Sequence, residues 1–317
     1  MCCNRCAGHY PIVHGIPDFR LQALCAFDLK CDRHRVQALY ADVDAQDMAV
    51  LVQRLFAQRE RDWGATLVSR SVAETLARPD RFAAHLDGWL GEVVQAPEQF
   101  LDIGCGSAGL VAAAARRGLI GLGIDLSLEK LLVGRRTVMA NGGTPMLAAA
   151  AAEALPLADG ALRTVTALDV IEHVADPAAV LRESERVLVP GGCLLLATPN
   201  RYSLSPEPHV FVWGVGWLPQ RWQAPYVRWR NGRAYQGTRL LSTWQLSYLI
   251  AADTSLDHRI VIPLVDEADA RGSRLRLTLI RLYNSLARLE LSRSLFLLIG
   301  PFFRVLAQKP LMSDGPA

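Results

Sequence analysis

The spacing of hydrophobic positions changes along the chain near residue 99. Before it, at 32–62 and 69–95, apolar residues recur every three or four positions, the period of an amphipathic helix. After it, short apolar runs alternate with helical segments, which is typical of parallel strands buried on both faces. The helical period is carried by Val36, Leu39, Tyr40 and Val43, and then by Val68, Val72, Leu76 and Phe82. The pattern predicts N-terminal helices followed by an α/β domain.

The alternating region predicts a regular succession of strands and helices. The strands are expected at 99–103, 119–124, 145–148, 163–168 and 192–198, and the helices at 107–117, 127–140 and 177–188. Ser127 and Asp176 are suited to cap two of these helices, and Gly118 follows the end of the third. This order predicts a doubly wound α/β sheet.

Composition narrows the classes of function. The chain has 317 residues, 51% of them hydrophobic, and a formal net charge of only +3, so nucleic acid is not expected as an obligatory partner. The N-terminal MCCNRCAGHYP lacks the apolar stretch of a signal peptide, and no run of about 18 apolar residues predicts a membrane span. We therefore expect a cytoplasmic protein.

Five of the seven cysteines lie within residues 1–31. Cys3 and Cys6 form a C-x-x-C pair, and the following YPIVHGIPDF resembles the second half of a small zinc ribbon. The first half is absent, so Cys25, Cys31 or a histidine would have to complete a four-ligand zinc site. The favoured interpretation is an eroded ribbon over 1–31 that binds no metal, keeps reduced thiols and uses YPIVHGIP for packing.

The stretch FLDIGCGSAGL at 100–110 places Gly104, Gly106 and Gly109 in the spacing G-x-G-x-x-G. Glycines at the end of a strand let the backbone approach a ligand, and Asp125 ends the next strand, where a carboxylate can bind two ribose hydroxyls. Nicotinamide enzymes and methyltransferases share these features. Asp102 precedes the glycines, where its charge would repel a diphosphate and attract a cationic amino-acid group. This favours S-adenosylmethionine as the ligand.

At four places the sequence resembles the class I S-adenosylmethionine-dependent methyltransferases, and among them the ubiquinone- and menaquinone-type small-molecule enzymes. These places are FLDIGCGSAGL, GLGIDLS at 121–127, AEALPLADGALRTVTALDVIEHVADP at 152–177 and RVLVPGGCLLLATPN at 186–200. The resemblance implies a Rossmann-like, mainly parallel seven-stranded sheet. GPFFRVLAQKP resembles its antiparallel last strand, and Pro301 and Arg304 make a membrane anchor the less favoured alternative.

The resemblance also implies a set of cofactor-binding residues. Asp125 would bind the ribose, Leu126 would flank the adenine, and Leu168 would close the strand beside the cofactor. The methionine portion would lie against Asp102, Gly104, Cys105 and Gly106, and the adenine ring near Ala152 and Glu153. Two positions depart from the family pattern, because Ala151 and Arg163 replace acidic residues that are frequent in relatives. These departures put one adenine hydrogen bond in doubt, unless the N-terminal helices supply a substitute partner.

Methyl transfer requires an acceptor held about 3 Å from the activated methyl group, water excluded and, for an oxygen acceptor, a base. Asp169 and His173 follow the fourth predicted strand and His209 follows the fifth, so these three are the candidate catalytic residues. Each has a structural alternative. Asp169 and Glu172 would cap a turn, His173 would pack or form a hydrogen bond, and His209 would be exposed on the surface.

The segment 201–240 departs most from the family pattern. No Asp or Glu occurs from Pro208 to Ala252, whereas five arginines and five of the seven tryptophans do. The arginines are Arg221, Arg228, Arg230, Arg233 and Arg239. A lid for an anionic or aromatic acceptor and a peripheral membrane contact through 213–239 both fit this mixture. A packed insertion with solvated arginines is the structural alternative, and nucleic acid binding is disfavoured because the rest of the chain is not basic.

These features predict three parts: the ribbon-like segment 1–31, a helical cap at 32–98, and a methyltransferase domain at 99–317 with a lid-like insertion at 201–240. The predicted reaction is methyl transfer from S-adenosylmethionine to a small hydrophobic or anionic acceptor, lipid-like and aromatic molecules included. One alternative is a non-catalytic protein that keeps the fold to bind the cofactor or a partner. Another is a nicotinamide oxidoreductase. The acceptor atom and the oligomeric state stay open.

Overall fold

The computed structural model describes residues 8–57, 64–89, 99–265, 267–270 and 273–311. The chain separates into two compact units, each built from several stretches. The first unit comprises 1–168, 179–194 and 309–317, and the second comprises 169–178 and 195–308. Among the described residues, no helix has both the length and the apolar character needed to cross a bilayer.

The N-terminal part of the first unit is helical, as predicted. The described part of the region 32–62 contains two helices, α1 (Leu29–Leu39) and α2 (Met48–Ala57), because α1 ends at Leu39 and the chain turns before residue 48. Helix α4 (Ala65–Trp89) covers the described part of the second predicted stretch. Val36, Tyr40 and Val43 are buried in one core with Leu131 and Leu132. Val36 of α1 thus packs onto the sheet domain together with Tyr40 and Val43 from the turn after it, whereas Leu39 and Leu76 of the predicted apolar face are exposed.

The segment YPIVHGIP packs against the same core, as the sequence predicts. It forms a two-stranded hairpin, β1 (Ile12–Val13) with β2 (Ile16–Pro17), followed by a 3-10 turn η1 (Gln22–Leu24), and Val13 and Ile16 are buried. Beyond the hairpin, the Phe19 amide donates to the Ala149 carbonyl at 2.7 Å. Cys25 and Cys31 are free thiols, and Cys3 and Cys6 lie outside the described residues. The zinc alternative therefore stays open.

The sheet has the order β5-β4-β3-β6-β7-β9-β8. In the first unit, β3 (Gln99–Ile103) pairs in parallel with β4 (Ile120–Asp125) and β6 (Leu162–Leu168), and β4 pairs in parallel with β5 (Met146–Ala149). β8 (Asp257–Val261) and β9 (Phe302–Gln308) are antiparallel, which confirms the predicted last strand. This is the doubly wound, mainly parallel sheet that the sequence predicts.

Strand β7 (Leu188–Pro199) begins earlier than the predicted 192–198. The sequence Pro-Gly-Gly at 190–192 is typical of a turn, but here it is paired: the Gly191 amide donates to Lys309 O, and the Lys309 amide donates to Gly192 O, both at 2.9 Å. A partner strand thus overrides the local turn signal. Such long-range pairing cannot be inferred from a local pattern.

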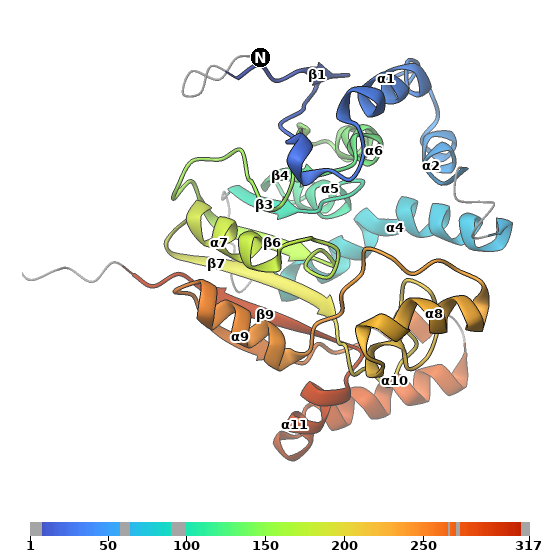
Figure 1. Ribbon diagram of the computed structural model, residues 1–317, viewed down its shortest axis with the longest axis vertical. Helices are drawn as coiled ribbons and strands as arrows, with labels where there is room; N and C mark the ends of the chain where they lie inside the picture. The colour runs from blue at the N-terminus through green and yellow to red at the C-terminus, as the bar shows by residue number, and fades with distance from the viewer. Residues whose placement is uncertain (1–7, 58–63, 90–98, 266, 271–272, 312–317) are drawn as a thin grey trace, which may run out of the picture. The chain divides into compact units, whose positions relative to one another are not determined.

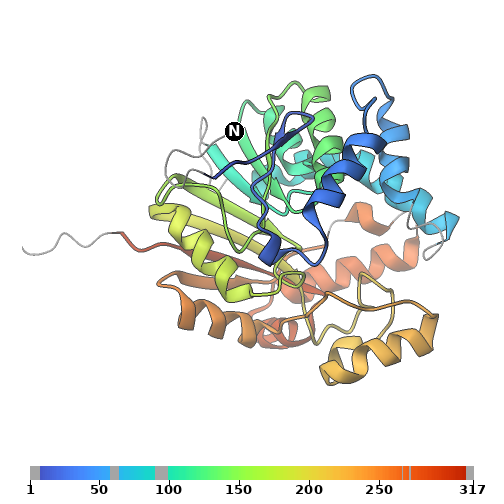
Figure 2. The ribbon, with the colours of Figure 1, turned by 45° about the horizontal axis from the view of Figure 1, so that its top comes forward.

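Three helices follow strands of the sheet: α5 (Gly109–Ala115), α6 (Leu128–Ala140) and α7 (Pro177–Val187). In the first unit, α5 contacts α4 and α6, and α1 and α2 lie beside α6 (Figures 1 and 2). Gly134 of α6 makes this packing close, because a Cβ atom there would lie 3.0 Å from the Ala108 Cβ. Helix α6 therefore packs directly against the turn that follows β3.

The second unit contains the described residues of the predicted insertion. There η2 (Val215–Trp217) and α8 (Gln220–Asn231) surround a small core of their own, made of Val210, Val212, Val215, Val227 and Tyr235. Helix α9 (Thr243–Asp253) contacts β8, and the turn η3 (Glu267–Ala270) precedes α10 (Arg274–Ala287) and α11 (Glu290–Ile299). Phe303, Val305 and Ala307 of β9 are buried, so the apolar C-terminal run is a core strand.

Candidate functional site

The glycine-rich turn lies between β3 and α5. Gly104, Gly106 and Ala108 have φ angles of +68°, +56° and +56°, a region in which glycine avoids the steric cost of a side chain. The Cys105 amide donates to Ile124 O at 3.0 Å, and the Gly106 amide donates to Asp125 Oδ2 at 2.9 Å. The turn is therefore fixed to the end of β4 through a direct contact between Gly106 and Asp125 that the sequence did not indicate.

Asp125 is buried and organises two segments at once. Its Oδ1 atom accepts a hydrogen bond from the Ser127 amide at 2.8 Å, and Ser127 caps α6 through Lys130 N. Each carboxylate oxygen has a second lone pair, so the group can still bind ribose hydroxyls. Asp125 thus has a structural role that is compatible with the cofactor role predicted for it.

Asp102 is buried next to Thr166, whose Oγ1 donates to Asp102 Oδ1 at 2.8 Å. Burial raises the pKa of Asp102 to about 7, the Thr166 hydrogen bond opposes this rise, and the charge of Asp125 adds to it. A bound cation would favour the ionised carboxylate. The environment therefore suits the cationic ligand that the sequence predicts, and Thr166 is a supporting residue that no motif indicated.

Arg78 is a second residue that the sequence analysis missed. Its Nη1 atom lies 3.6 Å from the position of a Cβ atom on Gly106, and its charge partly offsets the rise in the pKa of Asp102. Its placement depends on Gly109, where a Cβ atom would lie 2.8 Å from the Arg78 Cβ. The helical period predicts the α4 helix, but it gives no sign that this arginine lies beside the turn.

The remaining predicted cofactor residues lie around the same strand ends. Leu126, Ala152 and Glu153 are half-buried, and the Ala150 amide donates to Asp125 O at 3.2 Å, which ties the loop after β5 to β4. Leu168 is the last residue of β6 and is half-buried. Burial raises the pKa of the Cys105 thiol well above its usual range, so this residue contributes its backbone and not a thiolate.

A buried ion-pair network holds the chain after β4. Arg20 pairs with Asp18 and Asp32 at 2.8 Å each, and its Nη1 atom also donates to Leu126 O at 3.0 Å. Leu126 is the residue predicted to flank adenine. The N-terminal segment therefore helps to position a predicted cofactor residue, a role that its own sequence did not indicate.

The three predicted catalytic residues lie in the second unit. Asp169 is exposed and has a φ of +55°, and its amide donates to Ala197 O at 2.9 Å. His173 and His209 are 36 positions apart, yet their Nε2 atoms lie 3.0 Å apart. His209 is half-buried, and its Nδ1 atom lies 2.5 Å from Glu207 Oε1. His209 is therefore part of a polar cluster, and the alternative of a surface-exposed residue is wrong.

Glu172 completes this cluster. It is 1% exposed, its Oε2 atom accepts from Thr198 Oγ1 at 3.0 Å, and its buried Oε1 atom has no hydrogen-bond partner. Burial, followed by the charge of Asp169, raises the pKa of Glu172 to about 7. The sequence analysis interprets Glu172 only as a turn cap.

Glu207 was not predicted. Although burial alone would lower the pKa of His209, the hydrogen bond and charge of Glu207 raise it overall. Glu207 is itself buried, and its Oε2 atom accepts from the amides of His209 and Val210 at 2.9 Å each. The only sequence sign was the short spacing Glu-Pro-His, which is too common to be informative.

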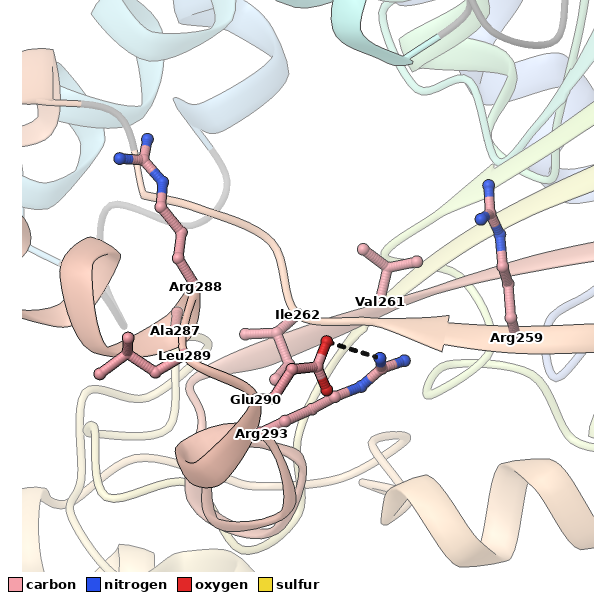
Figure 3. Close-up of a pocket in the computed structure, with 8 residues that line it drawn as sticks. All are labelled: Arg259, Val261, Ile262, Ala287, Arg288, Leu289, Glu290 and Arg293. Atoms are coloured by element: carbon pink, nitrogen blue, oxygen red, sulfur yellow. Dashed lines mark ion pairs between the residues drawn. The ribbon is translucent and has the colours of Figure 1, made fainter.

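A separate open pocket of about 280 Å³ lies between β8 and the turn from α10 to α11 (Figure 3). It is lined by Arg259, Arg288 and Arg293 and by one acidic residue, Glu290, which pairs with Arg293 at 3.8 Å. None of the predicted site residues is among its lining residues.

Comparison with known proteins adds a family match. Residues 101–196 match the family model described as a methyltransferase domain. The ubiquinone biosynthesis O-methyltransferase of Pseudomonas aeruginosa is 38% identical over 121 residues, which is 37% of this chain and 50% of that protein. The enzyme of the same name from Idiomarina loihiensis is 33% identical over 143 residues, 43% of this chain and 55% of that protein. The chain thus spans about half the length of the curated relatives it matches.

One solved structure similar to this chain is an S-adenosylmethionine-dependent methyltransferase from Thermotoga maritima, described as a possible histamine N-methyltransferase. It is 17% identical, with a TM-score of 0.47, and the match covers 82% of this chain and 98% of that one.

Proposed function

We infer that this chain, whose residues 101–196 belong to the class I S-adenosylmethionine-dependent methyltransferases, transfers a methyl group from S-adenosylmethionine to a small acceptor molecule. The observation that carries this proposal is the turn at Gly104 and Gly106, fixed to Asp125 and next to the buried Asp102. Asp125 offers oxygens to the ribose, and Asp102 offers a negative charge to the cationic methionine portion.

We propose a hydrophobic acceptor with a phenolic or quinol hydroxyl group. The relatives named ubiquinone biosynthesis O-methyltransferase support an oxygen acceptor on a lipid-like molecule. In such a reaction the acceptor oxygen bonds to the methyl carbon as the carbon–sulfur bond breaks. The electron pair stays on sulfur, which gives S-adenosylhomocysteine, and the hydroxyl loses its proton.

We assign this proton to the group formed by Asp169, Glu172, His173 and His209. The Nδ1 atom of His209 is held by Glu207, so its Nε2 atom faces away from that carboxylate and toward His173. An imidazolium formed there would be stabilised by the Glu207 charge. Chain connectivity supports the assignment, because Asp169 directly follows Leu168, the last residue of β6.

The test is a turnover assay with the full chain. The protein is incubated with S-adenosylmethionine and a set of phenols and quinols with apolar tails, and S-adenosylhomocysteine is measured by mass spectrometry. The proposal predicts S-adenosylhomocysteine formation that depends on the acceptor and stops in Asp102→Asn and His209→Ala. Thermal stabilisation by S-adenosylmethionine without turnover of any acceptor would favour the non-catalytic alternative. Stabilisation by NADH alone would favour an oxidoreductase.

We also propose that the second unit touches a membrane surface, where a lipid-like acceptor would reside. Trp222 and Trp229 of α8 are exposed together with Arg221, Arg228 and Arg230, the combination expected within 213–239. Aromatic rings favour the interface, and arginines favour anionic headgroups.

A second surface supports the same contact and was not predicted. Helix α10 has no fully buried side chain, and four of its leucines are exposed at helical spacing, as are leucines of the turn and of α11. They are Leu275, Leu279, Leu282, Leu286, Leu289, Leu291 and Leu295. Arg288 and Arg293 of the basic pocket lie among them in sequence, so apolar and basic groups occur together, as in helices that lie in a membrane interface.

A further inference from the structure

The rings of His173 and His209 face each other through their Nε2 atoms, and each Nδ1 atom faces an oxygen. The Nδ1 atom of His209 faces the Glu207 carboxylate at 2.5 Å, and the Nδ1 atom of His173 faces the Gly237 carbonyl at 3.3 Å. Both of these oxygens can only accept, so both Nδ1 atoms carry hydrogen. In neutral rings this leaves both Nε2 atoms with lone pairs, and these two atoms lie 3.0 Å apart. A cation between them would remove the repulsion.

Glu172 supplies the third group. One of its carboxylate oxygens and one ring nitrogen from each histidine all lie within 4.8 Å of one another. Its Oε1 atom is buried and has no hydrogen-bond partner, which is costly for a carboxylate oxygen unless a ligand satisfies it. The other oxygen is held by Thr198. The cluster thus presents one carboxylate oxygen and two imidazole nitrogens.

We propose that Glu172, His173 and His209 bind a divalent transition-metal ion of the zinc type. Two histidines and one carboxylate are a known ligand set for Zn²⁺ and for Fe²⁺, with at least one position left for another ligand. Nitrogens bound to one such ion at about 2.0–2.1 Å lie about 2.9–3.4 Å apart, which the two histidines already match. Small side-chain movements would bring the three ligand atoms, which lie within 4.8 Å of one another, to bonding distance from one ion.

Glu207 occupies the outer position that metal-binding histidines commonly require. A carboxylate that accepts from the second ring nitrogen fixes the ring and makes the ligand nitrogen more basic. The Gly237 carbonyl has the same relation to His173. Imidazole ligands favour transition metals, whereas Mg²⁺ prefers oxygen ligands and keeps its waters, so we expect Zn²⁺ to bind far more tightly than Mg²⁺.

The ion would have a role in the proposed reaction. With the ion bound, the Nε2 atoms of His173 and His209 are ligands and no longer accept the proton. A hydroxyl oxygen bound at the open position loses its proton more readily, and Asp169, which is exposed, takes the place of His209 as the proton acceptor. This role rests on the proposed function, but the binding of the ion does not. Binding is therefore measured without any acceptor or cofactor.

The experiment uses the full chain, stripped of metal by a chelator and titrated calorimetrically with Zn²⁺ and, separately, with Mg²⁺. The N-terminal cysteines could bind zinc too, so Cys3→Ser, Cys6→Ser is the background for every variant. We expect one bound Zn²⁺ per chain, at least a 100-fold loss of affinity in His173→Ala and in His209→Ala, and a loss of about 10- to 100-fold in Glu207→Gln.

His258→Ala is the matched control, because His258 belongs to the same unit and its Nε2 atom lies 3.0 Å from Ser247 Oγ, outside the cluster. Glu172→Gln keeps an oxygen for Thr198 and removes the charge, so it tests the carboxylate if a histidine variant is poorly folded. Absence of zinc binding in the background protein, or unchanged binding in folded His173→Ala and His209→Ala, would overturn the proposal. Unchanged zinc binding in the two histidine variants would indicate that a proton shared by the two Nε2 atoms, and not a metal ion, removes their repulsion.

Discussion

The Gly106 amide donates a hydrogen bond to Asp125 Oδ2 at 2.9 Å, across 19 positions of sequence. This contact joins the turn after β3 to the end of β4, the two places where the sequence predicts contact with the methionine portion and with the ribose. Because Asp125 also accepts from Ser127, which caps α6, one carboxylate sets the geometry of the turn and of a helix start. Substitutions at Asp125 therefore affect ligand contact and local structure together.

Asp125→Ala is expected to weaken S-adenosylmethionine binding at least tenfold. Charge-assisted hydrogen bonds to ribose contribute about 1.5–3 kcal/mol, and the substitution also leaves the Gly106 and Ser127 amides without their acceptors. The melting temperature should fall as well. Calorimetric titration and thermal unfolding measure the two effects. Asp80→Ala, which removes an exposed carboxylate of the same unit, is the control. Unchanged affinity in Asp125→Ala would remove this residue from the cofactor site.

Cofactor affinity is expected to rise with pH between about 6 and 8, because of Asp102. Burial raises its pKa to about 7, so below this pH the carboxyl is largely neutral and attracts a cation less. Binding of the cation should lower this pKa and release a proton. Calorimetry in buffers of different ionisation enthalpy near pH 7 measures the release. In Asp102→Asn, affinity should be lower and almost independent of pH across this range. If the cofactor affinity of the parent protein did not change with pH over this range, the proposed contact between Asp102 and the cationic methionine portion would be contradicted.

The same pKa shift predicts the pH dependence of stability. The pKa of Asp102 is higher in the folded state than the ordinary value of 3.8, so between these values the folded state binds more protons than the unfolded state. This group therefore makes the ligand-free protein less stable as the pH rises from about 4 to 7. Denaturant unfolding of the parent and of Asp102→Asn should show the parent losing stability relative to the variant over this range. Parallel curves would show that Asp102 titrates normally.

Gly104→Val is expected to abolish cofactor binding. Gly104 has a φ of +68°, a conformation that a β-branched residue adopts only with strain, and the side chain would also occupy space beside the ligand. Gly142→Val tests strain alone, since Gly142 has a φ of +78° and open space around its Cβ position. It should lower the melting temperature and keep cofactor affinity. Normal binding by a folded Gly104→Val variant would show that the ligand does not approach this turn.

Strong local signals predicted most of the sheet domain from the sequence. The strand at 99–103 and the cap at Ser127 are confirmed to the residue, because an apolar run and a capping serine act locally. The partners that tune the site were not predictable in this way. Arg78 and Thr166 lie next to their targets only after distant segments pack together, and no short pattern records that packing. Glu207 is only two residues from His209, but the local pattern Glu-Pro-His is too common to be informative.

The arginines of α8 are expected to act through charge. Arg228→Ala, Arg230→Ala should keep the fold and cofactor affinity and weaken binding to vesicles that contain anionic lipid, by roughly 10- to 30-fold for the pair, since each basic residue near the surface contributes about 1 kcal/mol. The difference should shrink as salt is added. Co-sedimentation with vesicles at several salt concentrations measures it. Equal vesicle binding and equal turnover for variant and parent would leave α8 as a packed insertion with solvated arginines.

The leucines of α10 are expected to act through apolar contact, which salt hardly screens. Leu279 and Leu282 are 55% and 54% exposed, so replacing both by serine removes no core packing and should leave the melting temperature nearly unchanged. Binding to vesicles should fall at least tenfold, because each CH₂ group buried in the bilayer contributes about 0.8 kcal/mol. Met139 and Met146 of the first unit are 52% and 44% exposed, so Met139→Ser, Met146→Ser is the matched control. A loss in the leucine variant that persists at high salt, with none in the methionine variant, would place α10 in the interface. Equal losses in both would reduce the effect to general surface hydrophobicity and remove α10 from the membrane contact.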